Sequence, residues 1–227
     1  MNIILSGYGK MGREVEKILL ERFHTVAAKI NNSGDLASVS SPDSLCIDFT
    51  TPDAFRANYK IIADNFSAAV IGTTGWNDIE NDVKAYFKSK NKGLVYASNF
   101  SIGVNICFET AELISKLTSA DGNYEPYIIE LHHNQKKDAP SGTAKTFASI
   151  LEKDYNRKFD IASVRAGNIK GIHTVGFESD YDKIVLHHEA YSRHGFAFGA
   201  VIAAEWLSET PCISQFRDLL KLKLKGD

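Results

Sequence analysis

Hydrophobic residues follow two different patterns along the first half of the chain. Short apolar runs predict buried strands, and several of the stretches between them repeat apolar residues at helical spacing. A strand–helix alternation of this kind is typical of a parallel sheet with helices on both faces. The expected strands are residues 2–5, 24–30, 45–49, 68–71 and 93–97, and the expected helices are residues 11–22, 52–66 and 77–88. Between the second and third strands, residues 31–44 are polar and turn-like, which predicts a short connection.

The helix near residue 52 has clear local signals. Thr51 is suited to capping a helix N-terminus, and Pro52 fits the first turn. The aromatic and aliphatic residues that follow at helical spacing are expected to face inward; they are Phe55, Tyr59, Ile62 and Phe66.

The pattern changes after Gly103. A long helix is expected over residues 104–117, with Ile106, Glu109 or Thr110, Leu113 and Leu117 on one side. Consecutive strands on short turns then predict a mixed or antiparallel sheet, whose open face would be a natural oligomer surface. These strands are residues 127–131, 161–165, 173–178 and 183–189, with a helix from Ser141 to about Asn156 and a hairpin turn over residues 179–182. Near the end of the chain, residues 195–207 predict a small-residue helix packed tightly against the first domain, and residues 213–224 have helical character.

These patterns predict an α/β chain with two domains. Residues 1–102, completed by about residues 195–227, would form a Rossmann-like, doubly wound parallel sheet that binds a dinucleotide. Residues 103–194 would form an α+β domain with a mixed or antiparallel sheet for substrate binding and oligomerisation.

Composition and charge narrow the possible partners. The chain has 227 residues, 24% of them charged, and a formal net charge of −2, which is ordinary for a globular protein and favours neither a nucleic acid nor a membrane partner. The apolar runs are too short to span a bilayer, and residue 2 already enters the first strand, so no leader is expected. The three cysteines are far apart and form no CxxC, which is typical of free thiols in a reducing compartment. We therefore expect a cytoplasmic protein.

A glycine-rich turn between the first strand and first helix predicts a nucleotide site. The GxGxxG residues are Gly7, Tyr8, Gly9, Lys10, Met11 and Gly12. In such a turn the glycines allow a tight bend, a close approach of the backbone to a pyrophosphate, and close packing of the helix. Two later strands also end in small or polar residues that one cofactor would touch together with this turn. These residues are Gly72, Thr73 and Thr74, then Ser98, Asn99, Phe100 and Ser101.

The choice between NADH and NADPH depends on the end of the second strand. NAD-selective folds usually place an acidic residue there to hold the ribose hydroxyls, but no acid occurs before Asp35. Lys29, and Lys10 inside the glycine turn, are instead suited to a 2′-phosphate. The sequence therefore favours NADPH, with NADH still usable.

The side chains best suited to catalysis and anion binding are concentrated between Glu130 and Thr146. His132 and His133 are the side chains best suited to moving a proton near neutral pH, and Lys136 adds a positive charge or a second acid. Backbone amides at a helix start favour an anion, and the residues there are Ser141, Gly142 and Thr143. This stretch predicts a site for a small carboxylate or phosphate with acid catalysis beside it.

In their order along the chain, these motifs resemble the dihydrodipicolinate reductase (4-hydroxy-tetrahydrodipicolinate reductase) family. The resemblance covers most of the chain, and the motif from Glu130 to Ala144 is its most specific part. The other matching segments are the glycine turn, Asp48-Phe-Thr50, Gly72-Thr-Thr-Gly75, Asn99-Phe-Ser-Ile-Gly-Val-Asn105, Val164-Arg-Ala-Gly-Asn168 and His173-Thr174.

The resemblance implies an NAD(P)H-dependent reductase of the diaminopimelate and lysine pathway, with a small dicarboxylate substrate. It implies that His132 is the principal proton donor or acceptor and that Lys136 is a second proton donor. His133, Gly142 and Thr143 would hold the dicarboxylate, and the glycine turn and the two later strand ends would line the cofactor. It also implies a homotetramer joined through the second-domain sheets.

The sequence alone leaves three other functions open. A metal hydrolase would use the pairs His132-His133 and His187-His188, but adjacent strand residues point to opposite faces, so each pair offers one metal at most one ligand. We therefore expect no metal site. A different NAD(P)H reductase, such as an amino-acid semialdehyde dehydrogenase, would need its own nucleophile. Cys46 lies in an expected strand and Cys107 in an expected helix, so neither is expected to be exposed enough to react. A non-catalytic NAD(P) sensor would have no use for His132 and Lys136.

Overall fold

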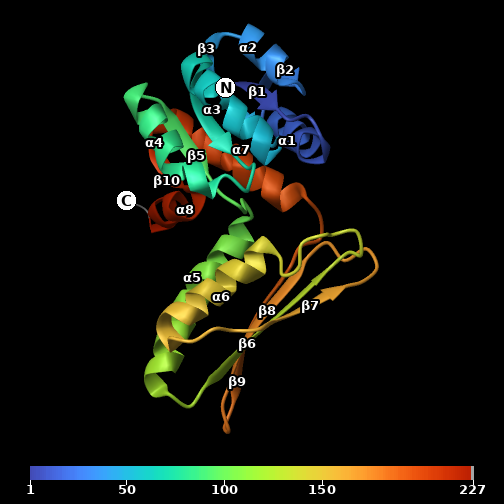
Figure 1. Cartoon of the computed structure of the whole chain (residues 1–227), viewed down its shortest axis with the longest axis vertical. Coiled ribbons are helices and arrows are strands. Elements are labelled where there is room, and N and C mark those ends of the chain that lie inside the picture. The colour runs from blue at the N-terminus through green and yellow to red at the C-terminus, as the bar shows by residue number, and fades with distance from the viewer. Residues whose placement is uncertain (226–227) are drawn as a thin grey trace. The chain divides into compact units, whose positions relative to one another are not determined.

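The fold comes from a computed structural model that describes residues 1–225. The chain divides into two compact units (Figure 1). Unit 1 contains Met1–Ser101 together with the segment from His194 onward, and unit 2 contains Ile102–Arg193.

Unit 1 is built on a six-stranded sheet in the order β10-β5-β4-β3-β1-β2. Every neighbouring pair is parallel, so the carboxyl ends of all the strands lie along one edge. The strands are β1 (Asn2–Ser6), β2 (Thr25–Ile30), β3 (Ser41–Asp48), β4 (Phe66–Ile71), β5 (Gly93–Tyr96) and β10 (Ile213–Gln215). This arrangement confirms the predicted Rossmann-like parallel sheet.

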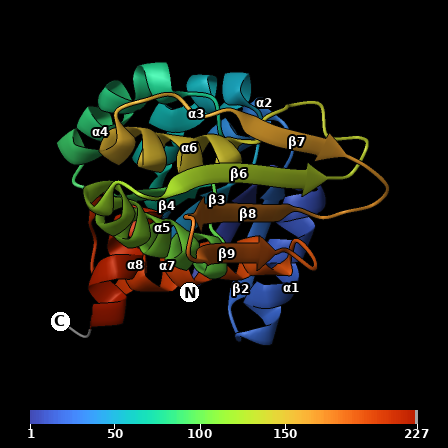
Figure 2. The ribbon, with the colours of Figure 1, turned by 90° about the horizontal axis from the view of Figure 1, so that it is seen from below.

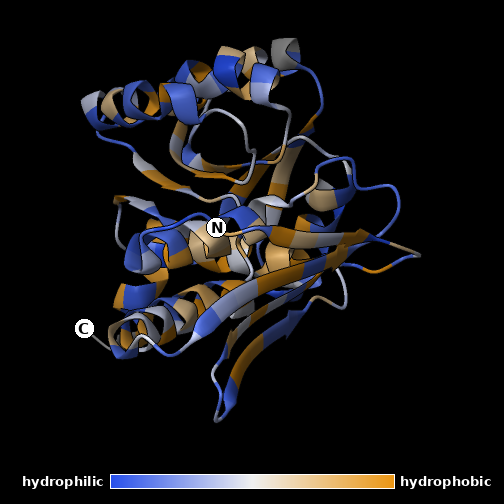
Figure 3. Cartoon of the chain, turned by 60° about the horizontal axis from the view of Figure 1, so that its bottom comes forward, coloured by the Kyte–Doolittle hydropathy of each residue, from blue (hydrophilic) through white to orange (hydrophobic). Residues whose placement is uncertain are grey.

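Helices cover both faces of this sheet. Figure 2 shows α2, α3 and α4 on one side and α1, α7 and α8 on the other. Their bounds are α1 (Lys10–Glu21), α2 (Ser33–Ser38), α3 (Pro52–Asn65), α4 (Glu80–Ser89), α7 (His194–Glu209) and α8 (Phe216–Lys225), and a 3-10 turn, η1 (Asn77–Ile79), precedes α4. Figure 3 shows hydrophobic residues along the strands and mixed bands on the helices, as expected for helices with one face on a core.

The predicted helix signals around Pro52 are confirmed. The Thr51 hydroxyl accepts a hydrogen bond from the Ala54 amide at 3.3 Å, and Pro52 is the first residue of α3. Phe55 and Ile62 are buried. Phe66 is also buried, as predicted, but its placement in this helix is wrong, because it is the first residue of β4.

Two further local predictions are wrong. Residues 31–44 are more than a connection: they contain α2 and the beginning of β3, because Leu36 is fully buried in the core and anchors a short helix there. At the other end, Ile213–Gln215 is a strand rather than helix. It pairs with β5, and the Leu94 amide donates to the Cys212 carbonyl at 2.7 Å, so long-range pairing decides its conformation.

The expectation that a small-residue helix packs tightly in unit 1 is confirmed. α7 contacts α1 and three strands of the sheet. A Cβ atom at Gly199 would lie 1.8 Å from the carbonyl oxygen of Phe100, so only glycine permits this approach.

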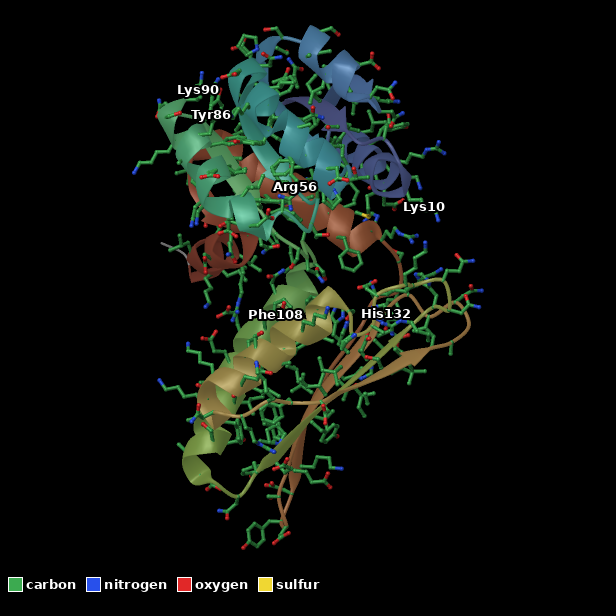
Figure 4. All side chains as sticks on the ribbon, viewed as in Figure 1. Lys10, Arg56, Tyr86, Lys90, Phe108 and His132 are labelled. Carbon is green, nitrogen blue, oxygen red and sulfur yellow. The ribbon has the colours of Figure 1, made fainter. Side chains whose placement is uncertain are left out.

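Unit 2 contains a four-stranded sheet in the order β7-β6-β8-β9. β6 and β7 are parallel and the other pairs are antiparallel, which confirms the predicted mixed sheet. The strands are β6 (Glu125–His132), β7 (Ile161–Arg165), β8 (Ile172–Glu178) and β9 (Lys183–Glu189), and the helices are α5 (Ile102–Asp121) and α6 (Gly142–Tyr155). Phe108 of α5, labelled in Figure 4, packs on Phe147 of α6 with ring centroids 4.7 Å apart.

One face of the unit 2 sheet carries the core and the other is uncovered within the unit. Ile128, Val175 and Phe177 are buried in the core with α5 and α6. On the opposite face, Val164 is 42% exposed and Val185 is 50% exposed. The side of α5 formed by Ile106, Leu113 and Leu117 is likewise exposed, so its buried residues are instead Val104, Asn105, Phe108, Ala111, Ser115 and Thr118.

Among the residues that the structure describes, no helix has the length and apolar character needed to cross a bilayer.

Candidate functional site

The glycine turn after β1 has the shape that a nucleotide site requires. Gly7 adopts a φ of 87°, and a Cβ atom there would lie 2.4 Å from the Phe49 carbonyl oxygen, so the bend requires glycine. A Cβ atom at Gly12 would lie 2.5 Å from the Gly7 carbonyl oxygen, so glycine also brings α1 close to the turn. No heavy atom lies within 4 Å of the position a Gly9 Cβ would occupy. The turn is therefore closed on the sheet side and open beside Gly9, which fits a bound pyrophosphate.

α1 begins at this turn without a competing anion. Its N-cap is Gly9, no side chain caps it, and its first turn contains no acidic residue. The amides of the first turn and the helix dipole are therefore suited to a phosphate group.

A pocket lies at the carboxyl ends of β4, β5 and β10. Its lining includes Thr73, Thr74 and Ser98, three of the residues predicted to contact a cofactor. The sheet therefore brings two predicted strand-end loops to one pocket within unit 1. Gly72 precedes Thr73, and its amide donates to the Asp48 carbonyl at 2.8 Å.

Asp48 joins three strand ends beneath these loops. It is fully buried, and its carboxylate accepts hydrogen bonds from the hydroxyls of Ser6 at 2.6 Å, Thr73 at 2.5 Å and Thr50 at 2.9 Å. Burial raises the pKa of Asp48, and the hydrogen bonds from Ser6, Thr73 and Thr50 oppose that shift. Asp48 therefore fixes the edge of the sheet on which the loops stand.

One of the two lysines predicted to meet a 2′-phosphate, Lys29, already has partners in unit 1. Lys29 Nζ lies 2.5 Å from Glu16 Oε1 and 4.8 Å from the centroid of the Tyr8 ring. The Tyr8 hydroxyl also donates to Glu16, and the Tyr8 amide donates to Asn31 at 2.9 Å. Lys10 is exposed at the start of α1 (Figure 4), and Met11 follows it, partly buried.

In the segment from Ser98 to Ser101, Ser98 is exposed, whereas Phe100 and Ser101 are buried. Phe100 is buried and packs against Phe49 and Phe216, with ring centroids 6.4 Å and 5.0 Å apart. The Asn99 side chain accepts a hydrogen bond from the Ser101 amide at 2.8 Å.

In unit 2, the predicted acid–base residues lie around the loop from β6 to α6. His132 ends β6 and is buried, whereas His133 and Lys136 are partly exposed. Lys136 Nζ pairs with Asp138 Oδ1 at 2.8 Å. Ser141 caps α6, with its hydroxyl accepting from the Ala144 amide at 3.2 Å, so Gly142 and Thr143 form the first turn as predicted.

A buried ion cluster lies behind His132. Glu130 is fully buried; its Oε1 accepts from Arg165 at 2.7 Å and from the Ser141 amide at 3.2 Å, and its Oε2 lies 2.5 Å from His132 Nδ1. Burial opposes ionisation of Glu130, but Arg165, Ser163, Ser141 and His132 together lower its pKa to about 2. Burial lowers the pKa of His132; the charge of Glu130 opposes this shift, and those of Lys136 and Arg165 add to it.

His173 of β8 completes this cluster. Its ring centroid is 5.1 Å from that of His132, and its Nε2 lies 3.2 Å from the Ser141 hydroxyl. Burial, with a contribution from the charge of His132, lowers the pKa of His173 to about 4, so this ring stays neutral near neutral pH.

The sequence patterns assign no role to Glu130, Arg165 or His173. A signal for Glu130 was present, because it occupies the same face of β6 as buried Ile128 and His132, where an acid is unusual. Arg165 and His173 reach the cluster through strand pairing, which no local pattern reveals.

Among the described residues, Glu130, His132 and His173 bring together three side chains that could hold a metal ion. Single ligand atoms of Glu130, His132 and His173 lie within 4.8 Å of one another. The set fits a divalent cation poorly, because the positive charge of Arg165 already pairs with Glu130. His187, on the opposite face of the sheet, lies 2.9 Å from the Thr174 hydroxyl.

Comparisons with known proteins agree along most of the chain. The family model described as dihydrodipicolinate reductase, N-terminus, matches residues 1–100, and the C-terminus model of the same family matches residues 103–220. A protein of Christiangramia forsetii named 4-hydroxy-tetrahydrodipicolinate reductase is 37% identical over 233 residues, covering 97% of this chain and 98% of its own. One of the same name from Methanocorpusculum labreanum is 34% identical over 252 residues, covering 97% and 98%.

Solved structures share the fold. A dipicolinate-bound dihydrodipicolinate reductase from Paenisporosarcina sp. TG-14 matches with a TM-score of 0.77 and 23% identity, covering 95% of this chain and 97% of that chain. Aspartate semialdehyde dehydrogenase II from Vibrio cholerae matches with a TM-score of 0.55 and 10% identity, covering 92% and 98%, which is a likeness of fold alone. The chain therefore belongs to the dihydrodipicolinate reductase family, and its activity is the reduction of 4-hydroxy-tetrahydrodipicolinate in lysine and diaminopimelate biosynthesis, for which its Rossmann-like fold implies a nicotinamide cofactor.

Proposed function

We propose that His132 is the proton donor of this reduction and that Lys136 is a second one. The observation that carries this proposal is the position of the His132 ring, whose Nδ1 atom lies 2.5 Å from Oε2 of the buried Glu130 carboxylate. An imidazole held in this way has one nitrogen committed to the protein and the other left for proton exchange. Residues 103–194 would then bind the substrate, and residues 1–102 with about residues 195–227 would bind the cofactor.

The chemistry of the reduction requires such a donor. Reduced nicotinamide, when bound, supplies a hydride to the substrate ring, and the overall conversion to tetrahydrodipicolinate releases water. Addition of a hydride leaves an electron pair on the substrate, which must be protonated. General acid catalysis at that step is typically worth about 10²–10⁴-fold in rate.

The loop after His132 suits a small dicarboxylate. α6 is long enough to have a substantial dipole, and its first turn, at Gly142 and Thr143, follows the Ser141 cap. Lys136 and His133 add side-chain donors on the same loop, in a turn where the Lys136 amide donates to the His133 carbonyl at 3.1 Å. The dipicolinate-bound structure of a protein with the same fold supports this choice of ligand, because dipicolinate carries two carboxylates.

For the cofactor, NADPH or NADH would bind along the carboxyl edge of the unit 1 sheet. The open turn at Gly9, the uncapped start of α1 and the pocket at Thr73, Thr74 and Ser98 support this placement. Lys10 and Lys29 favour NADPH, although Lys29 must leave Glu16 or share it to reach a 2′-phosphate.

The working unit that we propose is a cytoplasmic homotetramer joined through the uncovered faces of the unit 2 sheets. These faces expose Val164 and Val185, and apolar residues gathered on an open sheet favour self-association. The free cysteines fit a reducing compartment. Light scattering coupled to gel filtration tests the tetramer, and a monomer at micromolar concentration would contradict it.

One assay tests the activity and the cofactor together. Substrate is generated in situ from pyruvate and aspartate semialdehyde, and the loss of reduced-nicotinamide absorbance is followed with NADPH and with NADH. We expect turnover with both and a higher kcat/KM with NADPH. An absence of turnover with either nucleotide would contradict the activity, and a clear preference for NADH would contradict the proposed role of Lys10 and Lys29.

A further inference from the structure

The carboxylate behind His132 is unusually placed. Glu130 has no exposed surface, and it occupies a position on β6 where the neighbours on the same face, Ile128 and His132, are buried. Burying an ionised carboxylate costs several kcal/mol unless other groups compensate. Here Arg165 and His132 both lie against the Glu130 carboxylate and compensate for its burial. The fold must therefore hold all three side chains in place.

The two oxygens of Glu130 have separate partners. Oε1 accepts from Arg165 Nη2 at 2.7 Å and from the Ser141 amide at 3.2 Å, which ties it to β7 and to the start of α6. Oε2 lies 2.5 Å from His132 Nδ1, which is an ion-pair separation and not an aligned hydrogen bond. Arg165 also donates to the Asp138 carbonyl at 2.6 Å, so the guanidinium is itself held in place.

We propose that Glu130 is a positioning residue for the reduction: it holds the proton on His132 Nδ1, so that Nε2 is the atom that gives a proton to the substrate, and Arg165 holds Glu130 in that role. This proposal rests on the proposed function of His132 as proton donor. Neither Glu130 nor Arg165 is placed in contact with the substrate, and both act through the histidine ring.

The proton balance of the step is simple. The imidazolium ring of His132 carries protons on both nitrogens, the Nε2–H bond breaks, and the proton moves to the electron pair that the hydride leaves on the substrate. The ring keeps its Nδ1 proton, on the nitrogen that lies beside Glu130, and regains the Nε2 proton from solvent. No redox change occurs on the ring.

Four charged or titratable groups face His132 from the elements around it. They are Glu130 on β6, Arg165 on β7, His173 on β8 and Lys136 on the loop that follows. Among the three charged groups that act on its pKa, only Glu130 stabilises the imidazolium, because Arg165 and Lys136 are positive. Loss of the Glu130 charge therefore lowers the pKa of His132 further.

The substitution Glu130→Gln changes the hydrogen bonding offered to His132 while nearly preserving the size of the side chain at position 130. Arg165 and the Ser141 amide both donate toward the Oε1 position, so the amide oxygen of glutamine should take that side. The NH2 group then points at His132 Nδ1, which must accept a hydrogen bond instead of donating one. The neutral ring should change from the Nδ1–H form to the Nε2–H form.

A matched control is available on the same strand. Glu125 also lies on β6 and also pairs with an arginine, Arg157, but its side chain is 71% exposed. Glu125→Gln removes the same charge from β6 without touching the histidine cluster. Its kinetics and its His132 signals should match those of the parent protein.

The experiment combines NMR of isotope-labelled histidine with kinetics. In Glu130→Gln we expect the His132 tautomer to change, its pKa to fall, and kcat to drop about 10²-fold with little change in KM. The fall in kcat with rising pH should also begin at lower pH, because the protonated ring is lost sooner. Retention of the parent tautomer and pKa would overturn the proposal, whatever happens to kcat.

A second variant guards against a folding defect. Glu130→Asp keeps the charge but shortens the side chain, so the carboxylate cannot hold both Arg165 and His132; we expect a lower fraction of the Nδ1–H tautomer and a smaller loss of kcat than with glutamine. A parent-like tautomer in this variant would also overturn the proposal. His132→Gln distinguishes failure of the proposed function from failure of this proposal. An unchanged kcat in His132→Gln contradicts the role of His132 as donor. The tautomer of His132 in the Glu130 variants decides separately whether Glu130 positions the ring.

Discussion

Ser6 and Asp48 come from neighbouring strands, β1 and β3, and the Ser6 hydroxyl donates to Asp48 Oδ2 at 2.6 Å. Thr73, which follows β4, donates to the other oxygen at 2.5 Å. One buried carboxylate therefore joins the carboxyl ends of three strands. The loops proposed to bind the cofactor stand on this junction, so its integrity affects stability and cofactor affinity together.

Asp48→Ala should destabilise unit 1. The substitution leaves the buried hydroxyls of Ser6 and Thr73 without their acceptor, and each unsatisfied buried group costs about 1–3 kcal/mol. We expect the free energy of unfolding, measured in urea, to fall by about 2–4 kcal/mol. Asp43→Ala on the same strand is the control, because Asp43 is exposed; an equal loss in both variants would show that the junction contributes nothing specific.

Thr51→Ala tests a single helix cap. The Thr51 hydroxyl is the side-chain acceptor for the Ala54 amide at the start of α3. Its removal should lower the free energy of unfolding by about 1 kcal/mol, and Thr51→Ser should retain most of that stability because serine also caps. A serine variant as unstable as the alanine variant would indicate that the threonine methyl group, not the cap, is responsible.

Local chemistry explains why much of unit 1 could be predicted from the sequence. The Thr51–Pro52 signal and the glycine turn from Gly7 depend on residues close together in the chain. β10 could not be predicted in this way, because Ile213–Gln215 becomes a strand only by pairing with β5. Leu36 likewise anchors α2 through a core that forms from distant segments.

The candidate site shows the same division. One short segment contains His132, Lys136 and the helix start at Ser141, so a catalytic site there could be predicted from the sequence. Glu130 belongs to that segment too, but its importance depends on Arg165, which is brought in by the pairing of β6 with β7. A charge at a buried strand position therefore indicates a partner without identifying it.

His132→Gln should abolish most of the general acid contribution. We expect kcat to fall by about 10²–10⁴-fold, while the dissociation constant for NADPH, measured by fluorescence, stays nearly unchanged. His187→Gln is the control, because His187 is an exposed histidine of the same sheet. If the two variants have equal kcat values, His132 has no part in proton transfer.

Lys136→Ala should weaken substrate binding as well as turnover. Lys136 is partly exposed on the loop before α6, where its ammonium group is available to a carboxylate once it leaves Asp138. We expect KM for the substrate to rise about tenfold or more, since a hydrogen bond to a charged group is worth about 1.5–3 kcal/mol. Lys137→Ala removes the same charge from the adjacent exposed position. A KM that changes equally in both variants would mean that only the overall charge of the loop matters.

The buried His173 should make stability depend on pH. Its pKa in the folded protein is about 4, below the ordinary value of 6.5, so the unfolded chain binds a proton at a pH where the folded chain does not. The stabilising contribution of neutral His173 is complete above pH 6.5 and is lost as pH falls from there toward 4.

Comparison of urea unfolding at about pH 7 and about pH 5 tests this dependence. At the lower pH Glu130 remains ionised in the folded protein, because its pKa is about 2, and its own effect is small. The parent protein should lose about 2 kcal/mol more than His173→Gln between the two conditions, at about 1.4 kcal/mol per pH unit. The absolute stability of His173→Gln is expected to be lower, since the Ser141 hydroxyl loses its neighbour, so the change with pH is the decisive quantity. Parallel losses in the parent and in His173→Gln would show that another group, and not this ring, titrates in that window.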